Sequence, residues 1–303
     1  MSKIEVLKRH TLTGHRDCVY TLQPSSAEHL VFSASGDGMI AQWDLRNPEG
    51  GQLIAQLPNS VYALHYHPGS QLLIAGHNYD GIHVIDWENK KEVGSLQLTK
   101  AAIFDIQSLG EYLFVATGEG TVLKIAMQNL NIVATHQLSS KSARTIAVNK
   151  KRGEIAVGYS DNKIRVLDSD DLHVKYEWEA HANSVFTVRY TPDGQFLISG
   201  SRDARLKVWD VLSGYVKAEE VVAHLYAINH LDFSPDSKHF VTCSMDKSIK
   251  VWDTEALKLL KVIDRSRHAG HATSVNKVLW TSYQDQLLSA SDDRTISVWN
   301  IIF

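Results

Sequence analysis

Histidine, hydroxyl and carboxylate side chains recur together around four tryptophans, and these groups are able to transfer protons. Each tryptophan has a histidine 28 positions before it, with serine or threonine and aspartate between the two. Such groups side by side could form nucleophilic triads. A hydrolase needs one exposed nucleophile and an oxyanion hole, so four equivalent copies indicate a repeated structural network and no catalytic residue. The pairs are His15 and Trp43, His181 and Trp209, His224 and Trp252, and His271 and Trp299.

Cofactor sites find little support in the residues. Residues 118–120, Gly-Glu-Gly, begin like a dinucleotide-binding loop, but Leu123 stands where the third glycine should be. We interpret this segment as a turn between strands. The two cysteines, Cys18 and Cys243, form no Cys-x-x-Cys motif. We therefore expect no cofactor.

Metal binding is not expected either, although the chain has 15 histidines. His65, His67, His77 and His83 are close in sequence, and the first two share one face of a strand. No cysteine or well-spaced carboxylate completes a ligand set with them. We interpret them as surface or core histidines.

The composition is that of an ordinary soluble globular protein. The chain has 303 residues, a formal net charge of −3, 44% hydrophobic and 21% charged residues. The lack of a basic excess argues against a dedicated nucleic-acid binder. No apolar stretch reaches the roughly 18 to 20 residues that span a bilayer, and the charged N-terminal segment does not resemble a secretory signal. We expect a cytoplasmic protein, with a nuclear location left open.

A repeat of about 41 to 47 residues organises the whole chain. Between the four tryptophan-containing copies, the tryptophan slot is expected at Ile85, Ala126 and Leu167. An apolar residue 23 or 24 positions before each slot returns in all seven copies, as Val19, Val61, Ile103, Ala143, Val185, Ile228 and Val275.

Each copy predicts short strands, because apolar and polar residues alternate and are interrupted by Gly, Asp, Pro and Ser turns. In the fifth copy the strands are expected over residues 185–190, 196–200, 206–210 and 215–221. One small sheet cannot bury both of its faces alone, whereas sheets packed radially can. We predict an all-β, seven-bladed β-propeller with four antiparallel strands per blade, as a single domain over residues 1–303. Residues 4–9 should pair with residues 295–301, so that the N-terminal strand closes the last blade.

The repeats resemble those of the WD-repeat (WD40-type) family of β-propellers. Its two hallmarks are a Trp-Asp dipeptide, at residues 43–44, 209–210 and 252–253, and a Gly-His dipeptide, at residues 14–15 and 270–271. The resemblance implies hydrogen-bonded tetrads of a loop His, a strand Ser or Thr, a turn Asp and a third-strand Trp. The matching sets are His15, Ser33, Asp37, Trp43; His181, Ser199, Asp203, Trp209; His224, Thr242, Asp246, Trp252; and His271, Ser289, Asp293, Trp299.

Two details of the tetrads stay open or incomplete in the sequence. The hydroxyl could instead come from serines two residues further on, namely Ser35, Ser201, Ser244 and Ser291. Copies two to four lack the full set, with Tyr79 and Gly120 at the expected turn position of copies two and three. A hydrogen-bonded network predicts that its members are lost together, because a buried polar residue without its partners is unfavourable.

The resemblance also implies that partners bind the top face around the central channel. In the family, two positions of each repeat contact partners. The first is the residue directly after the first apolar residue of the innermost strand, and the second is the residue directly before the turn aspartate. The first positions are Tyr20, Tyr62, Phe104, Arg144, Phe186, Asn229 and Asn276. The second positions are Gly36, Asn78, Glu119, Ser160, Arg202, Met245 and Asp292. Four aromatic residues and an arginine have the composition of interface hot spots, although packing of the rings between blades is an alternative.

We therefore expect a non-catalytic protein-interaction scaffold that binds a peptide segment or protein partner, with Arg144 and Arg202 engaging carboxylates. It would be monomeric alone and a subunit of a complex.

Two alternatives remain at this point. One is an enzyme that uses the central channel. The other is a nucleic-acid or phospholipid binder with a basic patch at residues 150–152 or 265–271. The long interval before Trp299 further predicts that residues 265–268 form an extended loop.

Overall fold

The computed structural model describes residues 4–303, which form seven four-stranded antiparallel sheets. We call each sheet a blade and number the blades in chain order. The chain divides into two compact units, one of residues up to Val61 and from Asn229 onward, the other of residues Tyr62–Ile228.

The first unit holds blades one, six and seven. Blade one contains β2 (Val19–Pro24), β3 (Leu30–Ser35), β4 (Met39–Asp44) and β5 (Gln52–Gln56). Blade six contains β22 (Ile228–Phe233), β23 (His239–Ser244), β24 (Ile249–Asp253) and β25 (Leu259–Ile263). Blade seven contains β26 (Val275–Trp280), β27 (Gln286–Ser291), β28 (Ile296–Ile302) and β1 (Glu5–Leu12).

The second unit holds blades two to five. Blade two contains β6 (Val61–His67), β7 (Leu72–His77), β8 (Gly81–Asp86) and β9 (Lys91–Gln97). Blade three contains β10 (Ile103–Leu109), β11 (Tyr112–Thr117), β12 (Thr121–Ala126) and β13 (Ile132–Gln137). Blade four contains β14 (Ala143–Asn149), β15 (Glu154–Tyr159), β16 (Lys163–Asp168) and β17 (Val174–Glu179). Blade five contains β18 (Val185–Tyr190), β19 (Phe196–Ser201), β20 (Arg205–Asp210) and β21 (Val216–Val222).

Strand burial follows position within the blade. The second strand of each blade is almost wholly buried, as in β15, where every residue is buried. The fourth strand is more exposed, and in β17 exposed and partly buried residues alternate. Such alternation is expected of a strand with one face on a core and the other in water.

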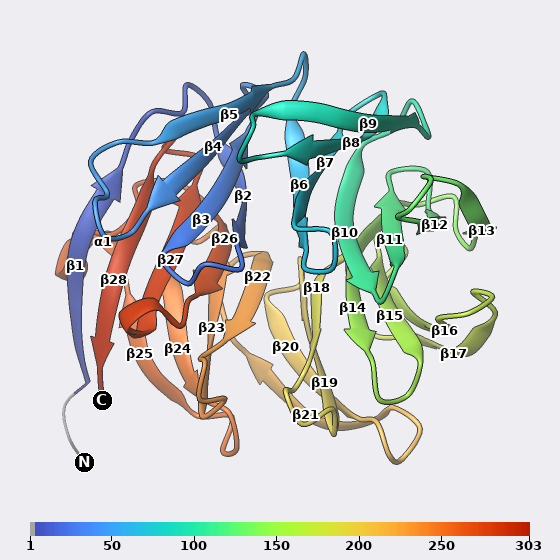
Figure 1. Cartoon of the computed structure of the whole chain (residues 1–303). Coiled ribbons are helices and arrows are strands. Elements are labelled where there is room, and N and C mark those ends of the chain that lie inside the picture. Colours follow the sequence, from blue (N-terminus) through green and yellow to red (C-terminus); the bar gives the residue numbers. More distant parts are fainter. Residues whose placement is uncertain (1–3) are drawn as a thin grey trace. The chain divides into compact units, whose positions relative to one another are not determined.

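The N-terminal strand completes blade seven, which confirms the predicted closure. β1 pairs antiparallel with β28, with Val6 opposite Ile301 and Leu12 opposite Ile296 (Figure 1). Lys8 Nζ also donates a hydrogen bond to the Ala269 carbonyl at 3.0 Å. The pairing covers an edge of β28 that would otherwise be open.

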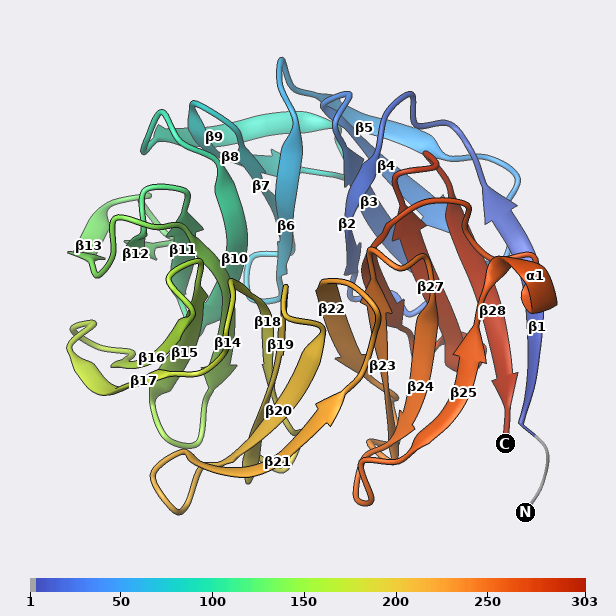
Figure 2. The ribbon, with the colours of Figure 1, turned by 180° about the vertical axis from the view of Figure 1, so that it is seen from behind.

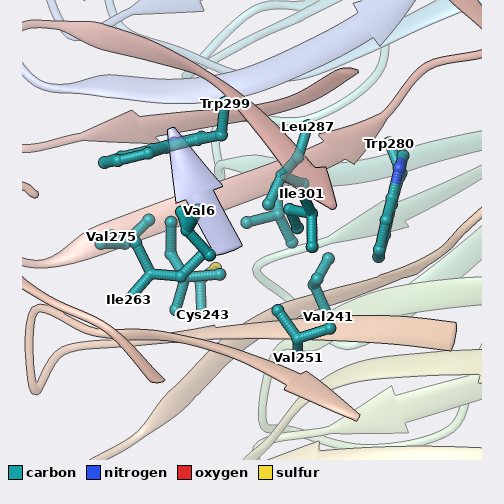
Figure 3. Packing of buried hydrophobic residues seen from close by; sticks show 12 residues of the cluster. Val6, Val241, Cys243, Val251, Ile263, Val275, Trp280, Leu287, Trp299 and Ile301 are labelled. Atoms are coloured by element: carbon teal, nitrogen blue, oxygen red, sulfur yellow. The ribbon is translucent and has the colours of Figure 1, made fainter. Parts of the chain in front are cut away.

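Hydrophobic side chains between neighbouring blades form the cores of each unit. Between blades six and seven, Val6 of β1 packs with Cys243, Val275 and Trp299 (Figure 3). The first strand of the chain therefore contributes to a core made mostly by its last 70 residues or so.

Two local predictions are corrected by the structure. Residues 265–268 form a short helix, α1 (Arg265–His268), and not an extended loop, because the Asp264 side chain caps it by accepting from the Arg267 N–H. In blade three the pair Leu113 and Ile125 corresponds to Val31 and Trp43 of blade one. Ile125, and not the adjacent alanine, therefore occupies the tryptophan slot, since the β10–β11 hairpin is short.

None of the helices within residues 4–303 is long and apolar enough to cross a membrane.

Candidate partner-binding site

The tetrad hydroxyls are enclosed and already hydrogen-bonded. In blade one the Trp43 indole N–H donates to Ser33 Oγ at 2.8 Å, and His15 Nε2 lies 2.7 Å from the same oxygen. Ser33 has no exposed surface. A substrate has no access to a hydroxyl with no exposed surface that also accepts from a buried indole, so the arrangement fits a structural network better than a nucleophile.

The same contacts recur in blades five and seven. The indole of Trp209 donates to Ser199 and that of Trp299 to Ser289, each at 2.9 Å, with the histidine 2.8 Å from the hydroxyl in both. In blade six the Trp252 indole donates to Thr242 at 2.9 Å. His224 is buried and belongs to the other compact unit.

The turn aspartates join the histidines to the backbone. Asp203 lies 3.0 Å from His181 Nδ1 and accepts from the backbone N–H groups of Ala182 and Arg205 at 3.0 Å. Although burial opposes ionisation, these bonds hold the pKa of Asp203 down at about 2. Burial lowers the pKa of His181, despite the opposing effect of Asp203. The histidine is thus neutral at pH 7, with Nδ1–H donating to the carboxylate and Nε2 accepting from the serine.

The alternative serines have a different role. The Ser201 hydroxyl donates to the Asn183 carbonyl at 3.0 Å and accepts from the Asp203 N–H at 3.1 Å. Ser35 and Ser291 make equivalent bonds in blades one and seven. These serines fix the turn, whereas those two residues earlier contact the tryptophan.

A series of β-bulges presents side chains at the start of the first strand of the blades. The register shifts at one residue where β2, β10, β14, β18 and β26 pair with the second strand of their blade. A bulged residue is left without a ladder partner and its side chain is re-aimed. The bulged residues are Tyr20, Phe104, Arg144, Phe186 and Asn276.

In the second unit three of these side chains and Tyr62, the second residue of β6, form a continuous row, which we call the Arg144 row: Tyr62, Phe104, Arg144 and Phe186. β14 packs between β10 and β18 (Figure 2). The rings of Tyr62 and Phe104 stack with centroids 5.7 Å apart and planes at 21°. The Arg144 guanidinium carbon lies 3.9 Å from the centre of the Phe104 ring and 4.8 Å from that of Phe186. All four side chains are partly exposed.

Arg144 is charged but has no acidic partner among residues 4–303. Burial lowers its pKa to about 10, with Tyr62 acting in the opposite direction. Its contacts are with ring faces, which attract a cation but do not use its N–H donors. The guanidinium can therefore still bind a carboxylate bidentately.

The predicted residues of the first unit make bonds within the fold. Asn276 Nδ2 donates to the Val19 carbonyl at 3.0 Å and to Asp292 at 2.7 Å. Asn229 Nδ2 donates to the Val275 carbonyl at 2.8 Å. These amides link adjacent blades, and Tyr20 beside them is partly buried.

The remaining predicted positions differ in exposure. Arg202 is exposed and Met245 is 50% exposed, so both are accessible. Asn78 is 3% exposed and lies inside the fold. Glu119 is exposed and stands at the turn-aspartate position of blade three, because that blade is one residue out of the expected phase.

The basic segments are partly neutralised by their neighbours. Arg152 pairs with Glu154, and Lys151 Nζ donates to the Asp193 carbonyl at 3.1 Å. Arg267 pairs with Asp264 in the α1 turn. Neither segment presents a cluster of unpaired cations.

The bulge is the feature that the sequence does not reveal. In the sequence, a bulged residue is marked only by its place directly after the first apolar residue of each copy. A second cluster, formed by His77, Asp80 and His83, was also missed because no carboxylate was expected near these histidines.

Comparison with solved structures defines the class of protein as a β-propeller. The crystal structure of the WD40 beta propeller domain of Doa1 superposes with a TM-score of 0.86 at 18% identity, covering 97% of each chain. The sequence family described as WD domain, G-beta repeat matches residues 7–44, 173–210, 217–253 and 263–300, the four segments that carry the tetrads. This chain belongs to the WD-repeat family and has the predicted seven-bladed β-propeller fold.

Curated relatives are distant and longer than this chain. The 66 kDa stress protein of Physarum polycephalum is 25% identical over 96% of this chain and 47% of its own length. THO complex subunit 3 of Arabidopsis thaliana is 25% identical over 67% of this chain and 65% of its own length. APC/C activator protein CDH1 of Saccharomyces cerevisiae is 27% identical over 68% of this chain and 38% of its own length. The chain thus spans less than two thirds of each of these relatives.

Proposed function

We propose that this chain is a non-catalytic protein-interaction module that binds a peptide segment through the Arg144 row. The recognised group would be a carboxylate, from an Asp or Glu side chain or a C-terminus, next to an apolar side chain. The carboxylate would bind Arg144, and the apolar side chain would pack on Tyr62 and Phe104.

One observation carries this proposal: Arg144 is desolvated, lies between two phenyl rings and has no acidic partner in residues 4–303. Keeping such a charge costs stability unless a ligand uses it. Aromatic and arginine side chains are also enriched among interface hot spots. Two of the relatives are named as a complex subunit and as an activator of a complex, which agrees with a role in assembly.

Nucleic-acid binding is the less favoured function. The cations of residues 150–152 and 265–268 are partly paired within the chain. If nucleic acid bound through them, its affinity would fall steeply with rising salt.

The proposal is tested by selecting ligands for the purified full chain from a displayed peptide library and measuring their affinities by fluorescence polarisation. Selected peptides should share an acidic residue or a free C-terminus. Arg144→Ala should weaken them roughly 30-fold or more, the usual cost of truncating one partner of a buried charge pair. Leu212→Ala, at a side chain 76% exposed and outside the row, is the matched control and should change nothing. Equal affinity for Arg144→Ala and the native chain, with both folded by circular dichroism, would remove the site.

A further inference from the structure

Two histidines and an aspartate meet at the corner between β7 and β8 in blade two. His77 ends β7, and His83 lies two residues into β8. The register pairs His77 with Gly81 and Ala75 with His83, so the two imidazoles are diagonal neighbours on one face. Asp80 lies in the turn between them.

The three side chains converge on a common point. Asp80 Oδ2 lies 3.6 Å from His77 Nδ1 and 3.7 Å from His83 Nε2. One ligand atom from each residue lies within 4.8 Å of the other two. Both distances from Asp80 to the imidazoles are slightly longer than a direct hydrogen bond.

The turn backbone holds Asp80 in place. Gly81 has φ 152°, and a Cβ there would lie 2.1 Å from the Leu96 carbonyl oxygen, so only glycine fits. Tyr79, with φ 70°, is in the left-handed region. The Asp80 carbonyl accepts from the Leu98 N–H at 3.0 Å, which ties the turn to the chain after β9.

A fourth residue orients one of the imidazoles. His83 Nδ1 lies 3.1 Å from Glu92 Oε2 on β9. Donation of Nδ1–H to this carboxylate leaves the lone pair on Nε2, the nitrogen that faces Asp80. A histidine that binds a metal usually donates its other ring N–H to a carboxylate in this way.

We propose that His77, Asp80 and His83 bind a divalent transition-metal ion of the zinc class. Ligand atoms about 2.0 to 2.1 Å from a tetrahedral Zn²⁺ are separated by about 3.3 Å. The two distances from Asp80 to the imidazoles, 3.6 and 3.7 Å, exceed this by a few tenths of an ångström, and the two imidazole nitrogens lie within 4.8 Å of each other. Two imidazoles favour such a metal over Mg²⁺ or Ca²⁺, which prefer oxygen ligands. This replaces the expectation that no carboxylate completes a ligand set near these histidines.

The site has a solvent-accessible side. The Asp80 side chain is 44% exposed and Tyr79 is 64% exposed. A fourth ligand, either water or a donor from a bound partner, has access from there.

Another group of similar composition lacks these features. Asp168, Asp171 and His173 also lie close together, but His173 Nδ1 is bonded directly to Asp171 at 2.6 Å and both side chains are more than half exposed. This group provides a matched control.

Chelator-treated full chain is titrated with Zn²⁺ by calorimetry and with Co²⁺ by visible absorption, which reports four-coordinate geometry. We expect one tight site per chain and a thermal midpoint raised by Zn²⁺. Asp80→Ala, at a half-exposed turn residue, should weaken binding at least 100-fold and abolish the midpoint shift. Glu92→Gln should weaken it about 10- to 100-fold, and His173→Ala should leave it unchanged.

Two results would overturn the proposal. One is the absence of stoichiometric binding to the native chain. The other is binding that persists in a folded Asp80→Ala variant or is lost in His173→Ala.

Discussion

The guanidinium of Arg144 lies 3.9 Å from the centre of the Phe104 ring, although the two residues are 40 positions apart and come from different blades. Desolvation that lowers the pKa of Arg144 to about 10 corresponds to about 3 kcal/mol. Two cation–π contacts offset about 1 to 2 kcal/mol of this penalty.

Replacing the charge with an apolar side chain of similar length should therefore stabilise the fold. We expect Arg144→Met to raise the free energy of unfolding by about 1 kcal/mol, measured by urea denaturation followed by circular dichroism. Arg202→Met, at an exposed arginine, should have no effect. Lower stability of Arg144→Met would show that the ring contacts outweigh the desolvation.

The bond between Ser289 and Trp299 should be strongly coupled to its surroundings. Ser289→Ala leaves the buried indole N–H without its acceptor and His271 Nε2 without the hydroxyl, which costs about 1 to 3 kcal/mol. Combined with Trp299→Phe in a double-mutant cycle, it should give a coupling energy of about 0.5 to 3 kcal/mol.

Ser297→Ala is the control in the same blade. Its hydroxyl is buried and has no hydrogen-bond partner among the described residues, so its removal should cost almost nothing. Equal losses for Ser289→Ala and Ser297→Ala would contradict the coupled network.

Stability should fall in acid in two steps. Burial lowers the pKa of His181, so the unfolded chain takes up protons below about pH 6.5 that the folded chain resists. Asp203 has its pKa lowered to about 2, so its contribution is present above about pH 4 and is lost between about pH 4 and 2. Asp203→Asn should be less stable than the native chain at pH 7, but the gap should narrow below pH 4. Urea midpoints at pH 7, 5 and 3 measure this, and a constant gap would show that the carboxylate charge is unimportant.

Removal of β1 should destabilise the fold and promote aggregation. A chain without residues 1–12 loses the pairing with β28 and the core contacts of Val6. Its melting temperature should fall and its light scattering on heating should rise, because the open edge of β28 can pair with other chains. Val6→Asp should lower stability through burial of an unpaired charge, whereas Glu5→Gln, at an exposed residue, should not. Unchanged melting of the truncated chain would show that the N-terminal strand is dispensable.

The sequence by itself determined the number of blades, their strands and the closure by β1. These features follow from patterns within each repeat. The 28-residue interval from His181 to Trp209, for example, spans the loop before β18, the β18–β19 hairpin and the turn into β20 of the same blade. Such local spacing is readable because hydrogen bonding and burial within one sheet repeat with the chain.

Only the tertiary structure decided which side chains meet. Arg144 and Phe186 come together because bulges re-aim residues on neighbouring strands, and Asp80 reaches His77 and His83 because Gly81 allows a tight turn. Which ring an arginine contacts, which ligand atoms lie close together and how exposed a side chain is all depend on strand register and on packing between elements. A linear pattern of apolar and polar residues does not encode these distances, so the candidate sites emerged from the fold and not from the repeat.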